Sequence, residues 1–351
     1  MLRLFFLRRC PRHGLIITIL LWLAGLGCAS SGSRASLERF EFSQPQMGSL
    51  FRITLYGPDE RTAAAAASNA FARVEQLNRI MSDYDSESEL TRLCRQPVST
   101  PTQVSPELFD ILTRSETLAR RSKGAFDVTV GPMVQLWRAA RRRNLLPTEA
   151  AIASARLHVG HEKIRLDPHA HTVTLLIENM RLDLGGIAKG FAADEALAVL
   201  RRRGITRAMC AASGDIAIGD PPPGKTGWRV GIAGLDEVGN QLQQTLLLHN
   251  AGISTSGDAE QYVEINGTRY SHIVDPATGL GLTNRLQVTI IAPNATLTDG
   301  LATAVSVLGM SQGMALADSY RHVGALVTVL ENGRPRVFES RRFRAISDAG
   351  N

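Results

Sequence analysis

One stretch constrains the fold of this chain more than any other, because it joins an apolar run to a helical pattern through two glycines. Residues 181–194 read Arg-Leu-Asp-Leu-Gly-Gly-Ile-Ala-Lys-Gly-Phe-Ala-Ala-Asp. We predict a strand that ends at Asp183, a tight turn at Gly185 and Gly186, and a helix over residues 188–203. A helix N-terminus after such a turn presents backbone N–H groups and the positive end of the helix dipole, which attract an anion such as phosphate.

Two further residues of this stretch fit a phosphate site. Gly190 would let the backbone approach a ligand closely, and Lys189 adds a positive charge one turn into the helix. The lysine is informative because the chain has only 4 lysines against 35 arginines. The stretch is neither a P-loop nor a Rossmann fingerprint, since it lacks both glycine spacings. The alternative is a turn between a strand and a helix that binds nothing.

The N-terminus has the pattern of a leader (residues 1–28) followed by a flexible, serine-rich tether (residues 29–36). The first twelve residues of the leader contain four arginines, and the apolar run that follows ends before Cys28 and is too short to span a bilayer. It resembles a bacterial lipoprotein signal peptide, although Gly25 stands where a leucine is usual. We therefore expect an exported protein that is anchored to the membrane through a lipidated Cys28, on the periplasmic or extracytoplasmic side. The alternative is an ordinary secretory signal that is cleaved nearby.

The charge distribution gives no support for a nucleic-acid partner. The formal net charge is +6, but the leader carries four of the arginines and no acid. Outside it, no basic run is interleaved with aromatic residues, and residues 138–143 are expected to form the solvated face of a helix. Cys94 and Cys210 lie beyond the leader and could pair in an exported protein, but their spacing leaves this open.

The pattern beyond the tether predicts one α+β domain over residues 37–346, with mixed or antiparallel sheets flanked by helices. A hydrophobic content of 44% allows a sizeable core. We expect strands at residues 37–42, 49–56, 208–218 (interrupted at 212–215), 228–233, 243–248, 261–265, 269–274, 286–292, 325–330 and 336–338, and a hairpin over 164–177. We expect helices at residues 59–81, 105–123, 299–308 and 312–320, and another through Leu136 and Trp137.

His272 is the first candidate for chemistry outside the glycine turn. It lies at a predicted strand end, three residues before Asp275-Pro276, where an imidazole can act as a general base or position a hydroxyl group. The alternative is a surface histidine in a hairpin. Upstream, residues 255–258 read Thr-Ser-Gly-Asp and offer hydroxyl groups, or form only a capped turn.

Asp299 and Thr303 are candidates for binding a metal ion. They are four residues apart at the start of a predicted helix, so their oxygens share one face and can reach one hard cation. The alternative is that Asp299 only caps the helix. Mg²⁺ takes few protein ligands and completes its shell with water and phosphate, which agrees with a phosphate site nearby.

The histidines of residues 158–171 are not expected to bind zinc. His158, His161, His169 and His171 surround Glu162, but their spacing matches no zinc pattern and no cysteine is close.

Seven motifs in the same order resemble the ApbE family, the FAD:protein FMN transferases, over residues 40–340. They are Met47-Gly-Ser, Met81-Ser-Asp-Tyr84, Gly124-Ala-Phe-Asp127 with Val130-Gly-Pro, Leu182-Asp-Leu-Gly-Gly-Ile-Ala-Lys-Gly190, Ser254-Thr-Ser-Gly-Asp258, His272-Ile-Val-Asp-Pro276 and Asp299-Gly-Leu-Ala-Thr303. Two positions depart from the family pattern. Residues 213–215 read Ser-Gly-Asp where Gly-Gly-Asp is more frequent, and Gly300 stands where alanine is usual.

The resemblance implies an ApbE-like, T-fold-type domain and an exported, Mg²⁺-dependent transferase. Such an enzyme cleaves FAD, its substrate, at the pyrophosphate and releases AMP. It attaches FMN through a phosphoester to a Thr or Ser of an acceptor flavoprotein, such as a subunit of a membrane redox complex.

The resemblance also implies roles for individual residues. The metal would be held by Asp299, Thr303 and the backbone carbonyl of Gly186, with Ala302 as a further contributor. His272 would activate the acceptor hydroxyl group, and Tyr84 would lie near the adenine. The FAD site would be lined by Met47, Tyr84, Ala125, Phe126, Asp127, Asp183, Lys189 and Ile273.

Two other functions compete with transfer. Water could attack in place of a protein hydroxyl group, which would make the protein a Mg²⁺-dependent FAD pyrophosphatase. Alternatively, the chain could be a non-catalytic FAD-binding lipoprotein. The presence of both His272 and the Asp299–Thr303 pair favours catalysis, because storage needs neither.

Overall fold

The computed structural model describes residues 36–235, 242–257, 262–331 and 333–349. The predictions for the leader, for most of the tether and for Asp258 therefore lie outside the described residues. The described part has an α+β architecture, which confirms the predicted fold class.

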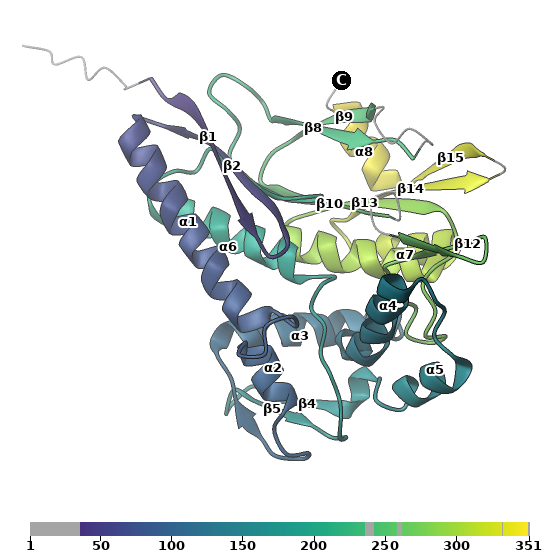
Figure 1. The fold of residues 1–351 in the computed structure, drawn as a ribbon. Coiled ribbons are helices and arrows are strands. Elements are labelled where there is room, and N and C mark those ends of the chain that lie inside the picture. The colour runs from purple at the N-terminus through teal and green to yellow at the C-terminus, as the bar shows by residue number, and fades with distance from the viewer. Residues whose placement is uncertain (1–35, 236–241, 258–261, 332, 350–351) are drawn as a thin grey trace, which may run out of the picture. The chain divides into compact units, whose positions relative to one another are not determined.

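Within the described residues, the central element is an eight-stranded sheet with the order β1-β2-β6-β7-β10-β13-β14-β15 (Figure 1). Every neighbouring pair in it is antiparallel. Its strands are β1 (Glu38–Gln46), β2 (Ser49–Gly57), β6 (Ala208–Ala212), β7 (Asp215–Ile218), β10 (Ala251–Gly257), β13 (Leu286–Ala292), β14 (Gly324–Glu331) and β15 (Arg334–Glu339).

Three smaller sheets accompany it in the described part of the chain. They are formed by β3 (Thr102–Gln103), β4 (Ile164–Asp167) and β5 (Thr172–Leu175), by β8 (Trp228–Ala233) and β9 (Leu242–Leu248), and by β11 (Tyr262–Ile265) and β12 (Thr268–Ser271). The helices are α1 (Glu60–Met81), α2 (Glu89–Cys94), α3 (Pro106–Arg121), α4 (Gly131–Arg143), α5 (Glu149–Arg156), α6 (Ala188–Arg202), α7 (Ala295–Asp318) and α8 (Arg341–Ala349), with short 3₁₀ turns at Val128–Val130 and His161–Lys163.

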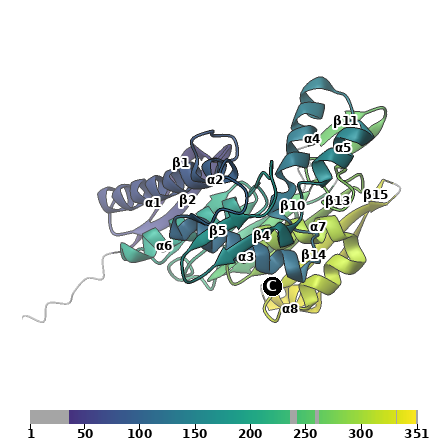
Figure 2. The ribbon, with the colours of Figure 1, turned by 90° about the horizontal axis from the view of Figure 1, so that it is seen from below.

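Both faces of the central sheet are covered, so its middle strands are apolar on both sides. Helices α1, α6 and α7 pack on one face, and the β8–β9 hairpin with α8 packs on the other (Figure 1). Strand β13 shows the consequence, since Val288 and Ile290 face the helices whereas Ile291 faces the hairpin. Helix α4, helix α5 and the β11–β12 hairpin share a separate apolar cluster around Trp137, and Figure 2 shows them gathered at one end.

Our prediction of a strand that ends at Asp183 is wrong. Strand β5 ends at Leu175, and residues 181–184 belong to no strand. The N–H of Asp183 donates to the carbonyl of Val128 at 2.7 Å, and the N–H of Leu182 donates to Cys94 Sγ at 3.3 Å. A loop and a side chain therefore hold this segment in place of a neighbouring strand.

Residues 251–257 form a strand, β10, that we did not predict, since we expected only hydroxyl groups and a turn at residues 255–258. It lies between β7 and β13 in the central sheet. The sequence hides it because buried hydroxyl groups replace the expected apolar side chains. Ser254 Oγ bonds to Thr298 Oγ1 at 2.7 Å, and Thr255 Oγ1 bonds to Thr289 Oγ1 at 2.9 Å.

Helix α7 begins earlier than predicted and joins the two helices that we expected. Asn294 caps it by accepting the N–H of Leu297, so Asp299 lies in the second turn and does not cap. Gly309, at φ 72°, interrupts the helix where the two predicted helices were separated. By length and composition α7 could cross a membrane, but it packs on α6 and on the central sheet as a core helix.

Candidate active site

The N-terminal turn of α6 and the second turn of α7 meet at Gly190. A Cβ at this position would lie 2.2 Å from the carbonyl oxygen of Ala295 and 2.8 Å from Asp299 Cβ, so only glycine fits. The N–H of Gly190 donates to Asp299 Oδ2 at 2.9 Å. Our expectation that Gly190 lets the backbone approach a ligand is therefore corrected, because α7 occupies that space.

Asp299 and Asp215 are two buried carboxylates close to a single lysine. Their exposed fractions are 6% and 4%, and Lys189 Nζ forms an ion pair with Asp215 Oδ2. Burial raises the pKa of Asp299 to about 8, and the charge of Asp215 adds to this rise, whereas Lys189 and the N–H of Gly190 oppose it. Ionising both carboxylates beside one lysine is therefore costly, and a bound cation would favour the ionised form of Asp299.

Thr303 and Gly186 complete a set of oxygen donors beside Asp299. Thr303 lies one turn after Asp299 on α7, and a Cβ on Gly186 would lie 2.9 Å from Thr303 Oγ1. Ala302 is buried, and its carbonyl oxygen accepts the hydroxyl of Ser306 at 2.8 Å. Carboxylate, hydroxyl and carbonyl oxygens are the ligands that Mg²⁺ prefers, so these residues fit that ion.

No group of three or more His, Cys, Asp and Glu side chains in the described ranges could hold a metal ion. A cation beside Asp299 would therefore also depend on the hydroxyl group of Thr303, the carbonyl of Gly186 and oxygens of a ligand. The histidines near Glu162 have other contacts: His171 stacks on Phe109, and His158 Nδ1 lies 2.9 Å from the carbonyl of Glu178.

A second cluster surrounds Arg138, which projects from α4. Its guanidinium pairs with Asp83 and, at 3.1 Å, with Asp183 Oδ2. The same group lies over the ring of Tyr84, 4.0 Å from the ring centroid. We expected Arg138 on a solvated helix face, and this is wrong for Arg138, although residues 141–143 are exposed as predicted.

The carboxylate of Asp183 connects this cluster to the glycine turn. Its Oδ1 accepts the N–H of Gly185 at 2.7 Å. Burial raises the pKa of Asp183 to about 6, with a further rise from the charge of Asp83, whereas the bond from Gly185 and the charge of Arg138 oppose the rise. The turn and the Arg138 cluster are therefore parts of one connected region.

Ala125, Phe126 and Asp127 lie next to the chain that precedes the turn. A Cβ on Gly131 would lie 2.5 Å from the carbonyl oxygen of Arg181, so the two segments touch. Phe126 points into the core, and Asp127 Oδ1 accepts both the N–H of Thr129, at 2.8 Å, and its hydroxyl group, at 2.7 Å. Their side chains are engaged within the fold, so a ligand would meet mainly backbone here.

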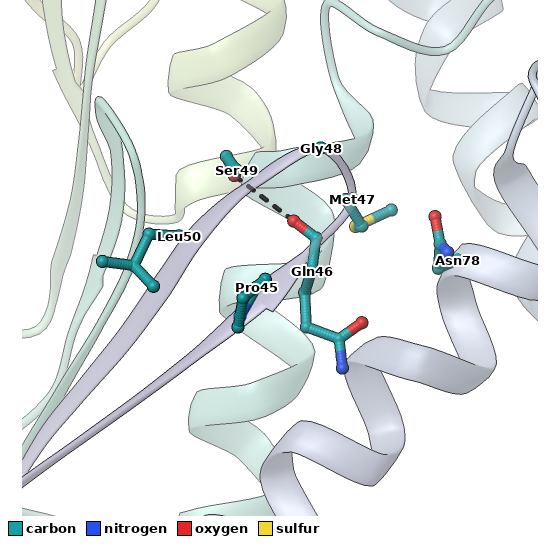
Figure 3. A pocket seen from close by; sticks show the side chains of 7 residues that line it. All are labelled: Pro45, Gln46, Met47, Gly48, Ser49, Leu50 and Asn78. Atoms are coloured by element: carbon teal, nitrogen blue, oxygen red, sulfur yellow. Dashed lines mark hydrogen bonds between the residues drawn. The ribbon is translucent and has the colours of Figure 1, made fainter.

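Met47 lines an open hollow of about 480 Å³ at the turn between β1 and β2 (Figure 3). Both Met47, at φ 49°, and Gly48, at φ 70°, have the left-handed conformation of a tight hairpin. Figure 3 shows the Met47 side chain directed toward Asn78 of α1. Because α1 ends at Met81, the hollow lies near the same end of this helix as Tyr84.

His272 lies half-buried in a well-bonded loop that follows β12. Ser271 donates its N–H to the carbonyl of Leu282 at 2.8 Å, and Leu282 donates to the carbonyl of Ile273 at 2.9 Å. Ser271 and the buried Ile273 line a small cavity together with Ser306, which lies one turn after Thr303 on α7. The histidine loop therefore packs against the helix that carries Asp299 and Thr303.

The same loop is tied to α4, since Trp137 Nε1 donates to the carbonyl of Gly279 at 2.8 Å. One residue of α4 thus holds the histidine loop, and the next residue, Arg138, holds Tyr84 and Asp183. The region combines a glycine turn at a helix N-terminus, a set of oxygen donors that suits a hard cation, an exposed aromatic ring and an imidazole. This combination suits the binding of a nucleotide diphosphate and a proton transfer beside it.

Sequence reasoning missed three residues of this region: Asp83, Arg138 and Asp215. Asp215 had a detectable signal, because it ends the Ser-Gly-Asp turn between the halves of a predicted buried strand. Asp83 lay within the Met81-Ser-Asp-Tyr84 motif without an assigned role, and Arg138 had no signal, because the two residues pair across 55 residues of sequence. Cys94 and Cys210 are both free thiols in the structure, so they do not form the disulfide left open above.

Comparisons with known proteins agree on one family. The model of the ApbE family matches residues 47–327. An FAD:protein FMN transferase of Klebsiella pneumoniae is 33% identical over 293 residues, covering 82% of this chain and 83% of that protein. One of Vibrio cholerae is 30% identical over 318 residues, covering 89% and 95%. The solved flavin transferase ApbE from Vibrio cholerae superposes with a TM-score of 0.80 at 29% identity, covering 88% of this chain and 99% of that one.

Proposed function

This chain belongs to the ApbE family, and from that membership we propose that it is an FAD:protein FMN transferase. The reaction moves the FMN half of FAD onto a Thr or Ser hydroxyl group of an acceptor flavoprotein and releases AMP. The observation that carries the proposal is the convergence of Gly186, Asp299 and Thr303 beside the Lys189–Asp215 pair. This set supplies both charges and oxygen donors for a diphosphate and its cation.

We propose Mg²⁺ as the cation, held by Asp299, Thr303 and the carbonyl of Gly186, with Ala302 close by. When bound, the ion would neutralise charge on the diphosphate during transfer. Lys189 adds a positive charge on the same side. The N–H groups of Ala188 and Gly190 are bonded within the fold, to the carbonyl of Leu184 and to Asp299 Oδ2, so the start of α6 contributes the positive end of its helix dipole. Phosphoryl transfer depends mainly on such charge neutralisation and on positioning.

The hydroxyl oxygen of the acceptor residue attacks the phosphorus atom of the FMN half. The bond between that phosphorus and the bridging oxygen breaks, and AMP leaves with the electron pair of that bond. His272 accepts the proton of the attacking hydroxyl group. The backbone bonds on either side of His272 keep its loop in place for this transfer.

The remaining proposed FAD contacts divide between the two halves of the nucleotide. Tyr84 offers a ring with 79% of its surface exposed, which suits stacking on adenine. Asp183 links this ring to the glycine turn through Arg138 and Gly185. Ala125, Phe126 and Asp127 lie next to the segment that precedes the turn. Met47 and Ile273 supply apolar surface at the edges of the region.

The test is mass spectrometry of an acceptor protein that carries a candidate Thr, incubated with purified enzyme, FAD and Mg²⁺. We expect the mass of one FMN to be added to the acceptor and AMP to appear in equal amount. A His272→Ala variant should still bind FAD and form far less product. Free FMN and AMP without acceptor labelling would instead indicate a pyrophosphatase, and FAD binding with no cleavage would indicate a storage protein.

We also propose that the protein is exported and anchored through a lipidated Cys28. The support is the pattern of residues 1–28, with its basic start, short apolar run and cysteine. An enzyme in this position would act on acceptors at the outer face of the cytoplasmic membrane.

A further inference from the structure

We propose that Arg138 is a positioning residue for the adenine half of FAD. Its guanidinium braces one face of the Tyr84 ring so that the other face accepts the base, and it holds Asp183 beside the glycine turn. This inference rests on the proposed function and adds to it a residue that no family motif contains.

The contacts of Arg138 are the first support. Its side chain is 20% exposed and reaches Asp83, with 17% of its side chain exposed, and Asp183, with 9% exposed. The guanidinium centre lies 4.0 Å from the centroid of the Tyr84 ring. One planar group therefore contacts a residue that follows α1 and a residue that precedes α6, and the two are far apart in sequence.

The charges of the cluster are the second support. Without Arg138, the carboxylates of Asp83 and Asp183 would lie close together without the cation that pairs with both. Their repulsion would then displace Asp183, whose Oδ1 accepts the N–H of Gly185 at 2.7 Å. An arginine suits this position better than a lysine, because its rigid fork bonds two carboxylates while its flat face covers a ring.

The exposure of Tyr84 is the third support. A tyrosine ring with 79% of its surface exposed would ordinarily rotate freely, but Arg138 covers one of its faces. A ring held in one orientation loses less conformational freedom when a base stacks on it. The adenine would then complete a stack of guanidinium, tyrosine and base.

Helix α4 does not need Arg138 for its own placement. Trp137 is 2% exposed and Met133 is 1% exposed, and both belong to the cluster that α4 shares with α5 and the histidine loop. Replacing Arg138 should therefore leave α4 and the fold intact.

The test measures equilibrium binding of FAD, AMP and FMN to unaltered protein and to Arg138→Ala. We expect the affinity for FAD and for AMP to fall by about tenfold, the effect of one lost base–aromatic stack. The affinity for FMN should fall by clearly less than that for AMP, because Arg138 contacts the Tyr84 ring directly and reaches the glycine turn only through Asp183. The rate of transfer at saturating FAD should change little, so that the loss appears in KM.

Three further variants separate positioning from general damage. Arg141→Ala removes an exposed arginine one turn along the same helix and should leave all three affinities unchanged. Arg138→Lys keeps the charge but not the fork, so its affinity for AMP should be intermediate. The double variant Arg138→Ala with Asp83→Asn removes the repulsion but leaves the ring unbraced, so AMP binding should remain weak.

Each outcome decides the inference. Unchanged AMP binding by Arg138→Ala, or an equal loss for AMP and FMN, would overturn it. Failure of the unaltered protein to bind FAD would overturn both this inference and the proposed function. FAD binding without transfer, combined with a selective loss of AMP binding in Arg138→Ala, would overturn the proposed function and leave the role of Arg138 standing.

Discussion

Individual residues decide how much charge the site carries, and Asp299 is the residue at which charge and packing can be separated. We expect Asp299→Asn to lower the transfer rate by at least about a hundredfold, because a carboxylate oxygen no longer helps to bind the cation. The amide oxygen can still accept the N–H of Gly190, and a buried group that is costly to ionise beside Asp215 is removed, so stability should be kept or raised.

Transfer rates and thermal melting in the presence of a chelator would check this prediction. Asp299→Ala is the matched control, since it removes the charge and also the bond to Gly190, and it should therefore melt lower than Asp299→Asn. Full activity of Asp299→Asn would contradict a metal role for this residue.

Ser213 carries backbone strain that a single substitution should relieve. It has φ 57° in the turn between β6 and β7, a conformation that glycine adopts more easily. We expect Ser213→Gly to raise the free energy of unfolding by up to about 1 kcal/mol, with FAD affinity unchanged. Urea denaturation would measure the gain. Ser213→Ala keeps a Cβ and should give none, and an equal gain in both variants would show that strain is not the cause.

Single residues also show which parts of the site could be predicted from the sequence and which could not. Gly186, Lys189, Asp299 and Thr303 stand out locally, since their spacing on a turn or a helix face is visible in a few letters. Arg138 resembles its neighbours at 141–143 in sequence, and only folding shows that it points inward. Gly190 was recognised as special for the wrong reason, because the atoms that require glycine there belong to α7.

At the level of elements, hydrogen bonds between α6 and the start of α7 hold the two helices that carry the site together. Asp194 of α6 accepts the N–H groups of Ala295 and Thr296, at 2.9 and 2.8 Å, and the hydroxyl group of Thr296. One carboxylate thus satisfies the first donors of α7, which carries Asp299 one turn later. We expect Asp194→Ala to lower the free energy of unfolding by about 1–3 kcal/mol, because these donors lose their acceptor.

The loss should depend on pH in a defined direction. Burial raises the pKa of Asp194, and this outweighs the bonds from Thr296 and Ala295. The stability that Asp194 contributes is therefore full below its unfolded pKa near 3.8 and falls as pH rises through its higher folded value. The deficit of Asp194→Ala, measured by urea denaturation, should be larger at pH 4 than at pH 7. Asp110→Ala, at an exposed ion pair, is the control that should show no such change.

Helices and strands with a regular hydrophobic periodicity were predictable from the sequence. Segments held by side-chain hydrogen bonds to distant residues were not. Helices α1 and α3 and the strands β2, β8 and β13 have regular apolar patterns and were predicted within a few residues. Strand β10 escaped prediction because Ser254 and Thr255 place paired hydroxyl groups on its two faces. Residues 181–184 resembled a strand because their sequence is largely apolar. Their hydrogen bonds instead go to the 3₁₀ turn at Val128–Val130 and to Cys94.

For the whole molecule, the described domain and the leader should separate cleanly. We expect a protein that begins at Ser36 to keep the melting temperature and FAD affinity of the mature protein, because the described contacts of the site all lie beyond this residue.

The full-length gene product should sediment with membranes and carry lipid on Cys28. Mass spectrometry of its N-terminus would check this, with Cys28→Ala as the control. A soluble product cleaved at another residue would show an ordinary secretory signal instead.

The contact between Gly190 and Asp299 joins positions 109 residues apart, and this separation has a consequence for biosynthesis. A nascent chain that has only reached α6 possesses the glycine turn but none of the partners that α7 brings to it. If the polypeptide crosses the membrane before it folds, the flavin pool inside the cell never encounters a finished catalyst. If the protein cleaves FAD and is exported as proposed, cytoplasmic FAD would be spared without a dedicated inhibitor.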